Sequence, residues 1–132
     1  MPYVAIVTVL ALLQYQWLGF AVGKARAKYN VPVPASGGNE MFERHYRVHM
    51  NTLEQLVVLL PAMWLFAHTV SPLWAAALGA VFIVGRFVYA RAYVRDPKSR
   101  SLGFALTALP SLIMLLGALL WAIWTLVGSP EG

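Results

Sequence analysis

Three polar side chains stand at helical spacing where a charged run leads into an apolar segment. Arg47, Asn51 and Glu54 occupy positions i, i+4 and i+7, which places them on one face of a helix. An ionisable side chain inside a membrane is costly, by roughly 2.5–3.5 kcal/mol at the centre of a helix. The stripe therefore indicates either a ligand site or a set of ion pairs that holds helices together.

A second polar stripe follows in the next helical segment. Arg86, Tyr89 and Tyr93 are spaced i, i+3 and i+7 and share a face. A short turn near Ser71 makes the two helices antiparallel neighbours, and equal distances from that turn bring Glu54 level with residue 88. We therefore expect Arg86 to be a buried counter-ion of Glu54, with the two tyrosines close by.

The two stripes together predict a polar slot with one carboxylate beneath a cationic mouth. The mouth is formed by arginines at the ends of their helices, Arg26, Arg47 and Arg100. A small anionic ligand with an amine and peptide groups fits such a slot, and glutathione is one example. Structural ion pairs and a path for an ion or proton are the alternatives that remain open.

The composition indicates an integral membrane protein. Hydrophobic residues make up 60% of the 132 residues and charged residues only 11%, against about 25% charged in soluble domains. We expect one membrane domain over residues 1–132. There is no cysteine, which excludes disulfides, thiolate metal sites and a cysteine nucleophile. Any thiol chemistry must therefore take its sulfur from a substrate.

Apolar runs and helix breakers predict an all-α bundle of four transmembrane helices. Their expected ranges are approximately 3–28, 40–70, 73–95 and 101–127. All ten Lys and Arg fall between residues 24 and 47 or between 86 and 100, so the positive-inside rule predicts two cytoplasmic basic loops and both termini outside. Gln14, a polar residue within the first span, is expected to make an interhelical hydrogen bond.

Two motifs resemble those of a known family. The run Phe42-Glu43-Arg44-x-Tyr46-Arg47-x-x-x-Asn51-x-x-Glu54 is similar to the signature of the MAPEG family, which includes microsomal glutathione transferases and leukotriene C4 synthase. Arg86-x-x-Tyr89-x-x-x-Tyr93-x-Arg95-x-x-x-x-Arg100 resembles the third-helix motif of that family. Order, spacing and the four-span layout match over nearly the whole chain.

The resemblance implies a membrane-bound glutathione transferase. Such an enzyme activates the glutathione thiolate for conjugation to lipophilic electrophiles, for reduction of lipid hydroperoxides, or for both. It also implies a homotrimer with each site between neighbouring subunits. For this chain we expect the bacterial inner membrane, with the site facing the cytoplasm.

The residue roles implied by the resemblance can be assigned position by position. Arg100 matches the arginine that stabilises the thiolate. The positions that match glutathione-binding residues are Arg26, Arg47, His49, Asn51, Glu54, Gln55, Tyr89 and Tyr93. His49 differs in residue type from the family position, and Gln55 stands where the leukotriene synthase-like members carry tyrosine.

Two other functions and a metal site are the alternatives to a glutathione transferase. The main alternative is a non-catalytic scaffold of the same fold that binds lipid or glutathione. A small four-helix exporter is disfavoured because the first span has no carboxylate. His45 and His49 are spaced i, i+4, but no third ligand converges on them and neighbouring arginines repel a cation, so we expect no metal site.

Overall fold

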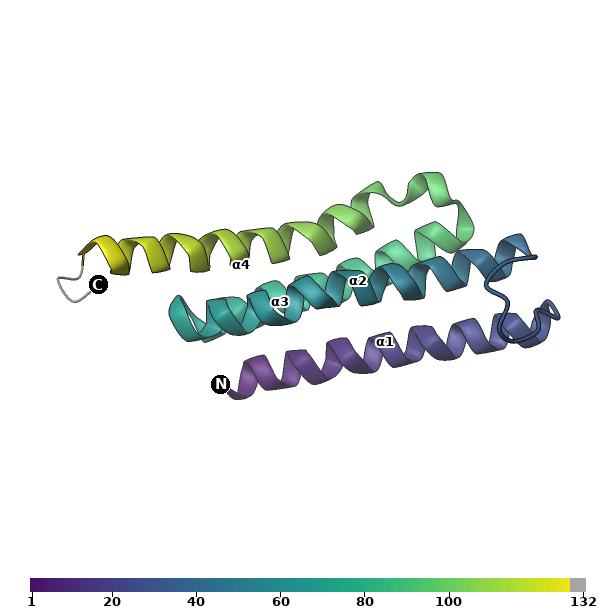
Figure 1. Cartoon of the computed structure of the whole chain (residues 1–132), viewed down its shortest axis with the longest axis horizontal. Coiled ribbons are helices and arrows are strands. Elements are labelled where there is room, and N and C mark those ends of the chain that lie inside the picture. Colours follow the sequence, from purple (N-terminus) through teal and green to yellow (C-terminus); the bar gives the residue numbers. More distant parts are fainter. Residues whose placement is uncertain (129–132) are drawn as a thin grey trace.

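The chain folds into four long helices joined by short connections (Figure 1). The computed structural model describes residues 1–128, and residues 129–132 of the expected domain lie outside the described residues. The helices are α1 (Pro2–Lys28), α2 (Glu40–Thr69), α3 (Pro72–Arg95) and α4 (Ser101–Gly128), with a 3-10 turn, η1 (Pro97–Ser99), before α4. Each helix is long and apolar enough to cross a membrane. The predicted all-helical bundle of four membrane-length helices is confirmed.

The helices run alternately up and down. The N-terminus and the end of α4 lie at one end of the bundle, whereas the α1–α2 and α3–α4 connections lie at the other (Figure 1). Helices α2 and α3 form the centre, with α1 packed against both of them and α4 packed against both of them. The segments that hold all ten Lys and Arg therefore occupy the same half of the bundle. We call this half the basic end.

Two side-chain caps fix where the central helices begin. The Asn39 side chain accepts a hydrogen bond from the Phe42 backbone N–H at 2.9 Å, and Ser71 accepts one from the Trp74 N–H at 3.2 Å. Such caps satisfy backbone N–H groups that have no partner within the helix. Pro72 follows Ser71 at the first position of α3, where proline is well tolerated. The caps thereby fix the first residues of the two helices that carry the polar stripes.

An apolar core joins the helices in the half opposite the basic end. Its largest fully buried members come from different helices, for example Leu59 and Met63 from α2, Phe82 from α3 and Met114 from α4. The predicted interhelical hydrogen bond of Gln14 is present, because its Nε2 donates to the Ile83 carbonyl oxygen at 2.9 Å. That bond ties α1 to α3 about halfway along the bundle.

Helix α4 is packed mainly over its first half. Its buried residues fall between Gly103 and Met114, and the residues that follow up to Gly128 are all exposed or half-exposed. Figure 1 shows the end of α4 extending beyond the other three helices. Its surface is rich in leucine and tryptophan, for example Leu120 and Trp124, as expected of a helix that faces hydrocarbon.

Glycines allow α3 and α4 to approach closely near the polar half of the bundle. A Cβ atom at Gly85 would lie 2.6 Å from the Leu106 Cβ, and one at Gly103 would collide with the Tyr89 backbone. Small residues at such crossings let membrane helices pack by van der Waals contact. The backbone of Tyr89 is therefore positioned directly by Gly103.

We expect Gly103→Ala to destabilise the bundle by about 1–3 kcal/mol, because the new methyl group must push α3 away from α4. Thermal unfolding in detergent measures this change. Gly23→Ala is the matched control, since a Cβ there meets nothing within 4 Å. It should be neutral or slightly stabilising, because alanine favours a helix over glycine. Equal midpoints for Gly103→Ala and the control would show that the close approach is not required.

Candidate functional site

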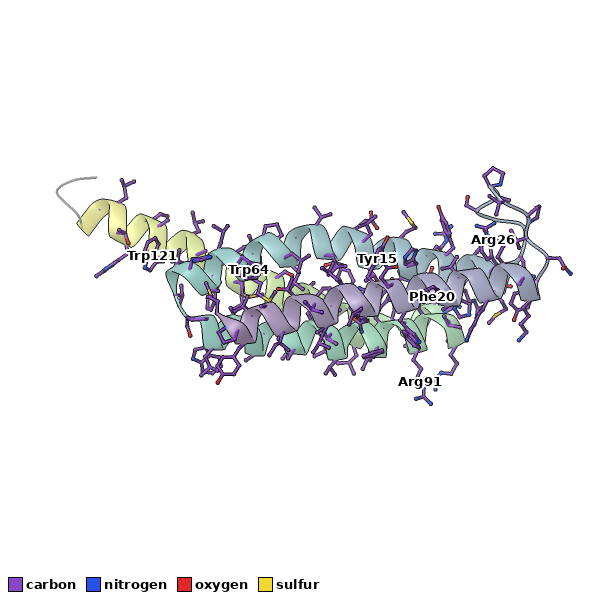
Figure 2. All side chains as sticks on the ribbon, turned by 90° about the horizontal axis from the view of Figure 1, so that it is seen from below. Tyr15, Phe20, Arg26, Trp64, Arg91 and Trp121 are labelled. Atoms are coloured by element: carbon purple, nitrogen blue, oxygen red, sulfur yellow. The ribbon has the colours of Figure 1, made fainter. Side chains whose placement is uncertain are left out.

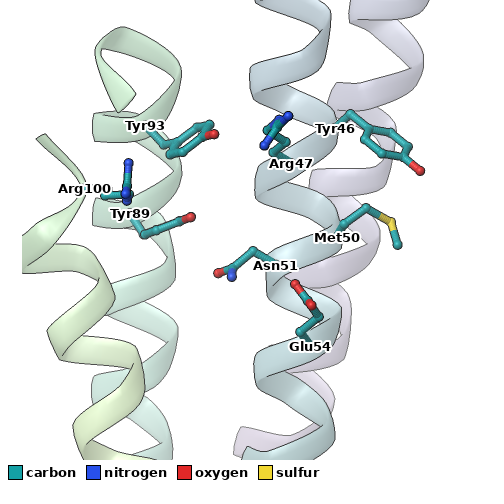
Figure 3. A pocket seen from close by; sticks show the side chains of 8 residues that line it. All are labelled: Tyr46, Arg47, Met50, Asn51, Glu54, Tyr89, Tyr93 and Arg100. Atoms are coloured by element: carbon teal, nitrogen blue, oxygen red, sulfur yellow. The ribbon is translucent and has the colours of Figure 1, made fainter. Parts of the chain in front are cut away.

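A polar cavity opens between α2 and α3 at the basic end. Its volume is about 350 Å³. The residues that line it are Tyr46, Arg47, Met50, Asn51, Glu54, Tyr89, Tyr93 and Arg100 (Figure 3). Six of these were predicted as site residues. Tyr46 and Met50 were not, although they continue to Glu54 at intervals of four residues and that spacing could have identified them.

Two walls of this cavity face each other. Figure 3 shows Tyr89 and Tyr93 pointing from α3 toward Asn51 and Arg47 on α2. The two tyrosine rings stack with centroids 5.6 Å apart and an interplanar angle of 22°. Arg100, between η1 and α4, lies beside these tyrosines and donates to the Pro97 carbonyl oxygen at 3.0 Å. The cavity therefore combines two cations, one carboxylate and three phenols.

Arg86 lies beneath the cavity and is completely buried. Its Nη1 donates to Asn51 Oδ1 at 3.0 Å and to Thr107 Oγ1 at 3.5 Å, and its Nη2 donates to Thr52 Oγ1 at 2.8 Å. Its guanidinium carbon also lies 4.2 Å from the centroid of the Tyr89 ring. One side chain thus links α2, α3 and α4 and contacts two residues of the cavity wall.

The expected ion pair between Arg86 and Glu54 is not formed, and this prediction was wrong. Within residues 1–128 the only ion pair is Arg44–Glu40, at 2.7 Å. Thr52 and Glu54 are two residues apart, about 200° around the helix, so the Thr52 side that meets Arg86 faces away from Glu54. Neutral oxygens accept from its two Nη atoms instead, and Glu54 is exposed on the side of the cavity.

The two threonines that hold Arg86 were not predicted. Thr52 and Thr107 also donate to backbone carbonyls in their own helices, those of Val48 at 2.7 Å and Phe104 at 2.8 Å. Threonine in an apolar helix commonly does this without any partner on another helix, so its residue type gives little signal. Only the packing of α2, α3 and α4 shows that their oxygens converge on one cation.

Arg86 also fixes the orientation of the Asn51 amide. A guanidinium has only donors, so Asn51 must present its oxygen to Arg86 and its NH₂ group remains available as a donor. Figure 3 shows the Asn51 side chain directed toward the α3 wall of the cavity. Asn51 is thereby suited to donate to a carbonyl or carboxylate oxygen of a ligand.

Three residues predicted for the site do not line this cavity in the single chain. Gln55 is half-buried outside the lining. His49 stacks on Tyr15 of α1, with ring centroids 4.3 Å apart, and so faces the other side of α2. Within residues 1–128, no group of three or more His, Asp or Glu side chains lies close enough together to hold a metal ion.

Arg26, the third of these residues, is held by the α1–α2 connection. Its Nη1 donates to the carbonyl oxygens of Val31, Pro32 and Ala35, and its guanidinium lies 4.7 Å from the Phe42 ring centroid. Its Nη2 makes no hydrogen bond within residues 1–128. The connection therefore orients Arg26 at the surface and leaves part of its guanidinium available.

The chain is thus a small integral membrane protein with a polar cavity at one end of a four-helix bundle. The profile of the MAPEG family matches residues 4–120. The chain therefore belongs to the MAPEG family.

Individual relatives agree with this assignment. An uncharacterized protein of the cyanobacterium Synechocystis sp. is 51% identical over 92% of this chain and 89% of its own length. Human microsomal glutathione S-transferase 2 is 36% identical over 87% of this chain and 79% of its own length. Bovine leukotriene C4 synthase is 31% identical over 73% of this chain and 64% of its own length.

We expect Arg86→Lys to lower the stability of the bundle by roughly 1–2 kcal/mol. A lysine keeps the charge but cannot reach Asn51, Thr52 and Thr107 with one planar fork, and interhelical hydrogen bonds in membranes average about 0.6 kcal/mol each. Thermal unfolding in detergent measures the loss. The exposed Arg91→Lys is the control and should unfold like wild type. Unchanged unfolding of Arg86→Lys would show that charge alone, without the fork, is sufficient.

Proposed function

We propose that this protein is a membrane glutathione transferase whose site is the cavity between α2 and α3. The observation that carries the proposal is the convergence of Arg47, Asn51 and Glu54 from α2 with Arg100 from the α3–α4 junction. The similarity to human microsomal glutathione S-transferase 2 supports it. The substrates are then glutathione and a lipophilic electrophile or lipid hydroperoxide.

The charges of the cavity suit glutathione. This tripeptide carries two carboxylates and one ammonium group near neutral pH, a net charge of −1. Two arginines and one glutamate give the cavity a net charge of +1. We assign Glu54 to the ammonium group, Arg47 to a carboxylate and the Asn51 NH₂ to a peptide carbonyl. The two tyrosine hydroxyls can donate to the remaining oxygens.

Arg100 is assigned to the thiol. A cysteine thiol has a pKa of about 8.5, so only a few per cent is thiolate near neutral pH. A cation at contact distance lowers such a pKa by roughly 1–3 units. Arginine stays protonated and therefore stabilises the thiolate without accepting its proton, which leaves through water at the open side of the cavity.

The thiolate can then react in two ways. In conjugation its sulfur forms a bond to an electrophilic carbon as the bond from that carbon to a leaving group breaks. With an activated double bond, the π bond breaks instead and the product then takes a proton from water. In peroxide reduction the sulfur takes the terminal oxygen as the O–O bond breaks, which releases an alcohol and leaves a sulfenic acid. A second glutathione then forms the disulfide and releases water. Apolar electrophiles concentrate in the bilayer, which favours a site at the membrane surface.

A trimer with sites between subunits is part of this proposal. Glu54 lies 14 residues into α2, about 21 Å from its start, yet is exposed in the single chain. A carboxylate at that depth is costly next to hydrocarbon. A neighbouring subunit would cover it, and Arg26 or His49 of that neighbour could then complete the glutathione site.

The proposed location is a bacterial inner membrane with the basic end in the cytoplasm. Clustering of Lys and Arg beside the spans supports this orientation. Glutathione is a cytosolic peptide, so the same orientation opens the cavity toward its supply. The similarity to a cyanobacterial protein is consistent with a bacterial membrane.

Replacing Arg100 by leucine should raise the pKa of bound glutathione by roughly 1–3 units, toward that of the free thiol. The cation favours the charged form, so its loss removes thiolate most strongly below pH of about 8.5. A pH titration of the thiolate ultraviolet absorbance, with glutathione and detergent-purified protein, measures the shift. Arg91→Leu removes an exposed arginine outside the cavity and should titrate like wild type.

The same titration distinguishes catalysis from the scaffold alternative. Thiolate that forms in wild type and is lost only in Arg100→Leu supports the transferase. If wild-type protein binds glutathione without ionising it, the site is non-catalytic and the scaffold interpretation replaces ours. If glutathione does not bind at all, the cavity serves another ligand.

Replacing Glu54 by glutamine should weaken glutathione binding roughly tenfold, because a charge-assisted hydrogen bond to the ammonium group is lost. Calorimetric titration measures the affinity. N-acetylated glutathione lacks that charge and should bind wild type and Glu54→Gln equally. Glu43→Gln, outside the cavity lining, is the protein control. An equal loss for both ligands would assign Glu54 to a structural role.

A further inference from the structure

A second cavity, larger than the first, lies among α1, α2 and α3 at the basic end. Its volume is about 700 Å³. Trp17 and Leu18 of α1, Met41 and Val48 of α2 and Phe87 of α3 supply much of its apolar wall. We call it the outer groove, and it shares no lining residue with the candidate glutathione cavity.

The outer groove and the glutathione cavity lie on opposite sides of α3. Phe87 and Arg91 face the groove, and each stands two residues before the tyrosine that faces the other cavity, Tyr89 or Tyr93. Two residues correspond to about 200° around a helix. A molecule in the groove therefore cannot reach Arg100 of the same chain, so the groove is a separate site.

The rim of the groove is basic. Arg44, His45, Arg91 and Arg95 line it, and no Asp or Glu of the described chain does. Arg44 already donates to the Val94 and Arg95 carbonyl oxygens, at 2.9 and 3.2 Å, and to Glu40. The side chains of Arg91 and Arg95 make no hydrogen bond or ion pair within residues 1–128 and are exposed. Two cations without an internal partner among residues 1–128 thus lie at the rim of an apolar groove.

The arrangement matches a lipid at a membrane surface. Arg91 and Arg95 belong to the last turns of α3, and Figure 2 shows Arg91 projecting sideways from the half of the bundle where Arg26 lies. Phe87 lies eight residues before Arg95, about 12 Å deeper along the helix. There it packs edge-on against Trp17, with ring centroids 5.6 Å apart. Both rings are about half exposed, at 47% and 55%, so hydrocarbon can reach them.

We propose that the outer groove binds an anionic phospholipid of the surrounding bilayer. The phosphate lies between the Arg91 and Arg95 guanidinium groups, and an acyl chain runs over Phe87 and Trp17. Basic residues at a membrane surface attract anionic headgroups, and arginine matches the phosphate oxygens with a planar fork. The proposal concerns a different face from the glutathione cavity and does not depend on the proposed function.

Native mass spectrometry of the detergent-purified protein tests the proposal, with phosphatidylglycerol, phosphatidylcholine and oleate added in turn. We expect wild type to retain phosphatidylglycerol and not phosphatidylcholine. The double variant Arg91→Gln with Arg95→Gln should retain phosphatidylglycerol roughly tenfold less, since each cation near the surface contributes separately. Both side chains are exposed and make no internal contact by hydrogen bond, so the fold should persist.

The matched control removes two other exposed cations of the basic end, Lys24→Gln with Lys98→Gln, which lie outside the groove. It should retain phosphatidylglycerol like wild type. Ala21→Phe, which fills the groove without changing charge, should reduce retention while the rim is intact. The proposal is overturned by equal loss in the lysine control, by full retention in Ala21→Phe, or by equal retention of phosphatidylcholine. Preferential retention of oleate over phosphatidylglycerol would also overturn it, in favour of a single-chain acid.

Discussion

The buried guanidinium of Arg86 is the interaction on which the polar half of this bundle depends. Burying a charge without a carboxylate is costly, and here oxygens from α2 and α4 and the face of the Tyr89 ring replace its hydration. Since the oxygen partners belong to α2 and α4, moving either of these helices relative to α3 breaks a contact of Arg86. Arg86 thereby couples packing of the bundle to the position of Asn51 and Tyr89 in the cavity wall.

This coupling leaves Glu54 without an ion-pair partner among residues 1–128. Had Arg86 paired with Glu54, both charges would be neutralised inside the bundle and the cavity would contain neither. With the guanidinium directed to neutral oxygens, the carboxylate remains on the open side, where a ligand ammonium can meet it. The proposed glutathione site thus follows from where Arg86 finds its hydrogen bonds. The direction of these hydrogen bonds also accounts for the exposure of the Glu54 carboxylate in the single chain.

Helix α3 borders both cavities of the bundle. The tyrosine face of α3 forms the wall of the polar cavity, and its opposite face, with Phe87 and Arg91, borders the outer groove. Gly103 lets α4 approach the Tyr89 backbone, so the third side of the same helix is occupied as well. Helix α3 therefore separates the two cavities and packs against α4 on a third side.

The sequence alone predicts the four helices and their basic half, because hydropathy, helix breakers and the placement of charges are local properties. It also identified Arg47, Asn51 and Glu54 as one face, since helical spacing is local. The partner of Arg86 could not be predicted from the sequence. A short turn fixes how far along two neighbouring helices their residues lie, but it does not fix how each helix is rotated about its own axis. That rotation, set by packing of small residues and threonines, turned Arg86 toward α4 and left Glu54 open.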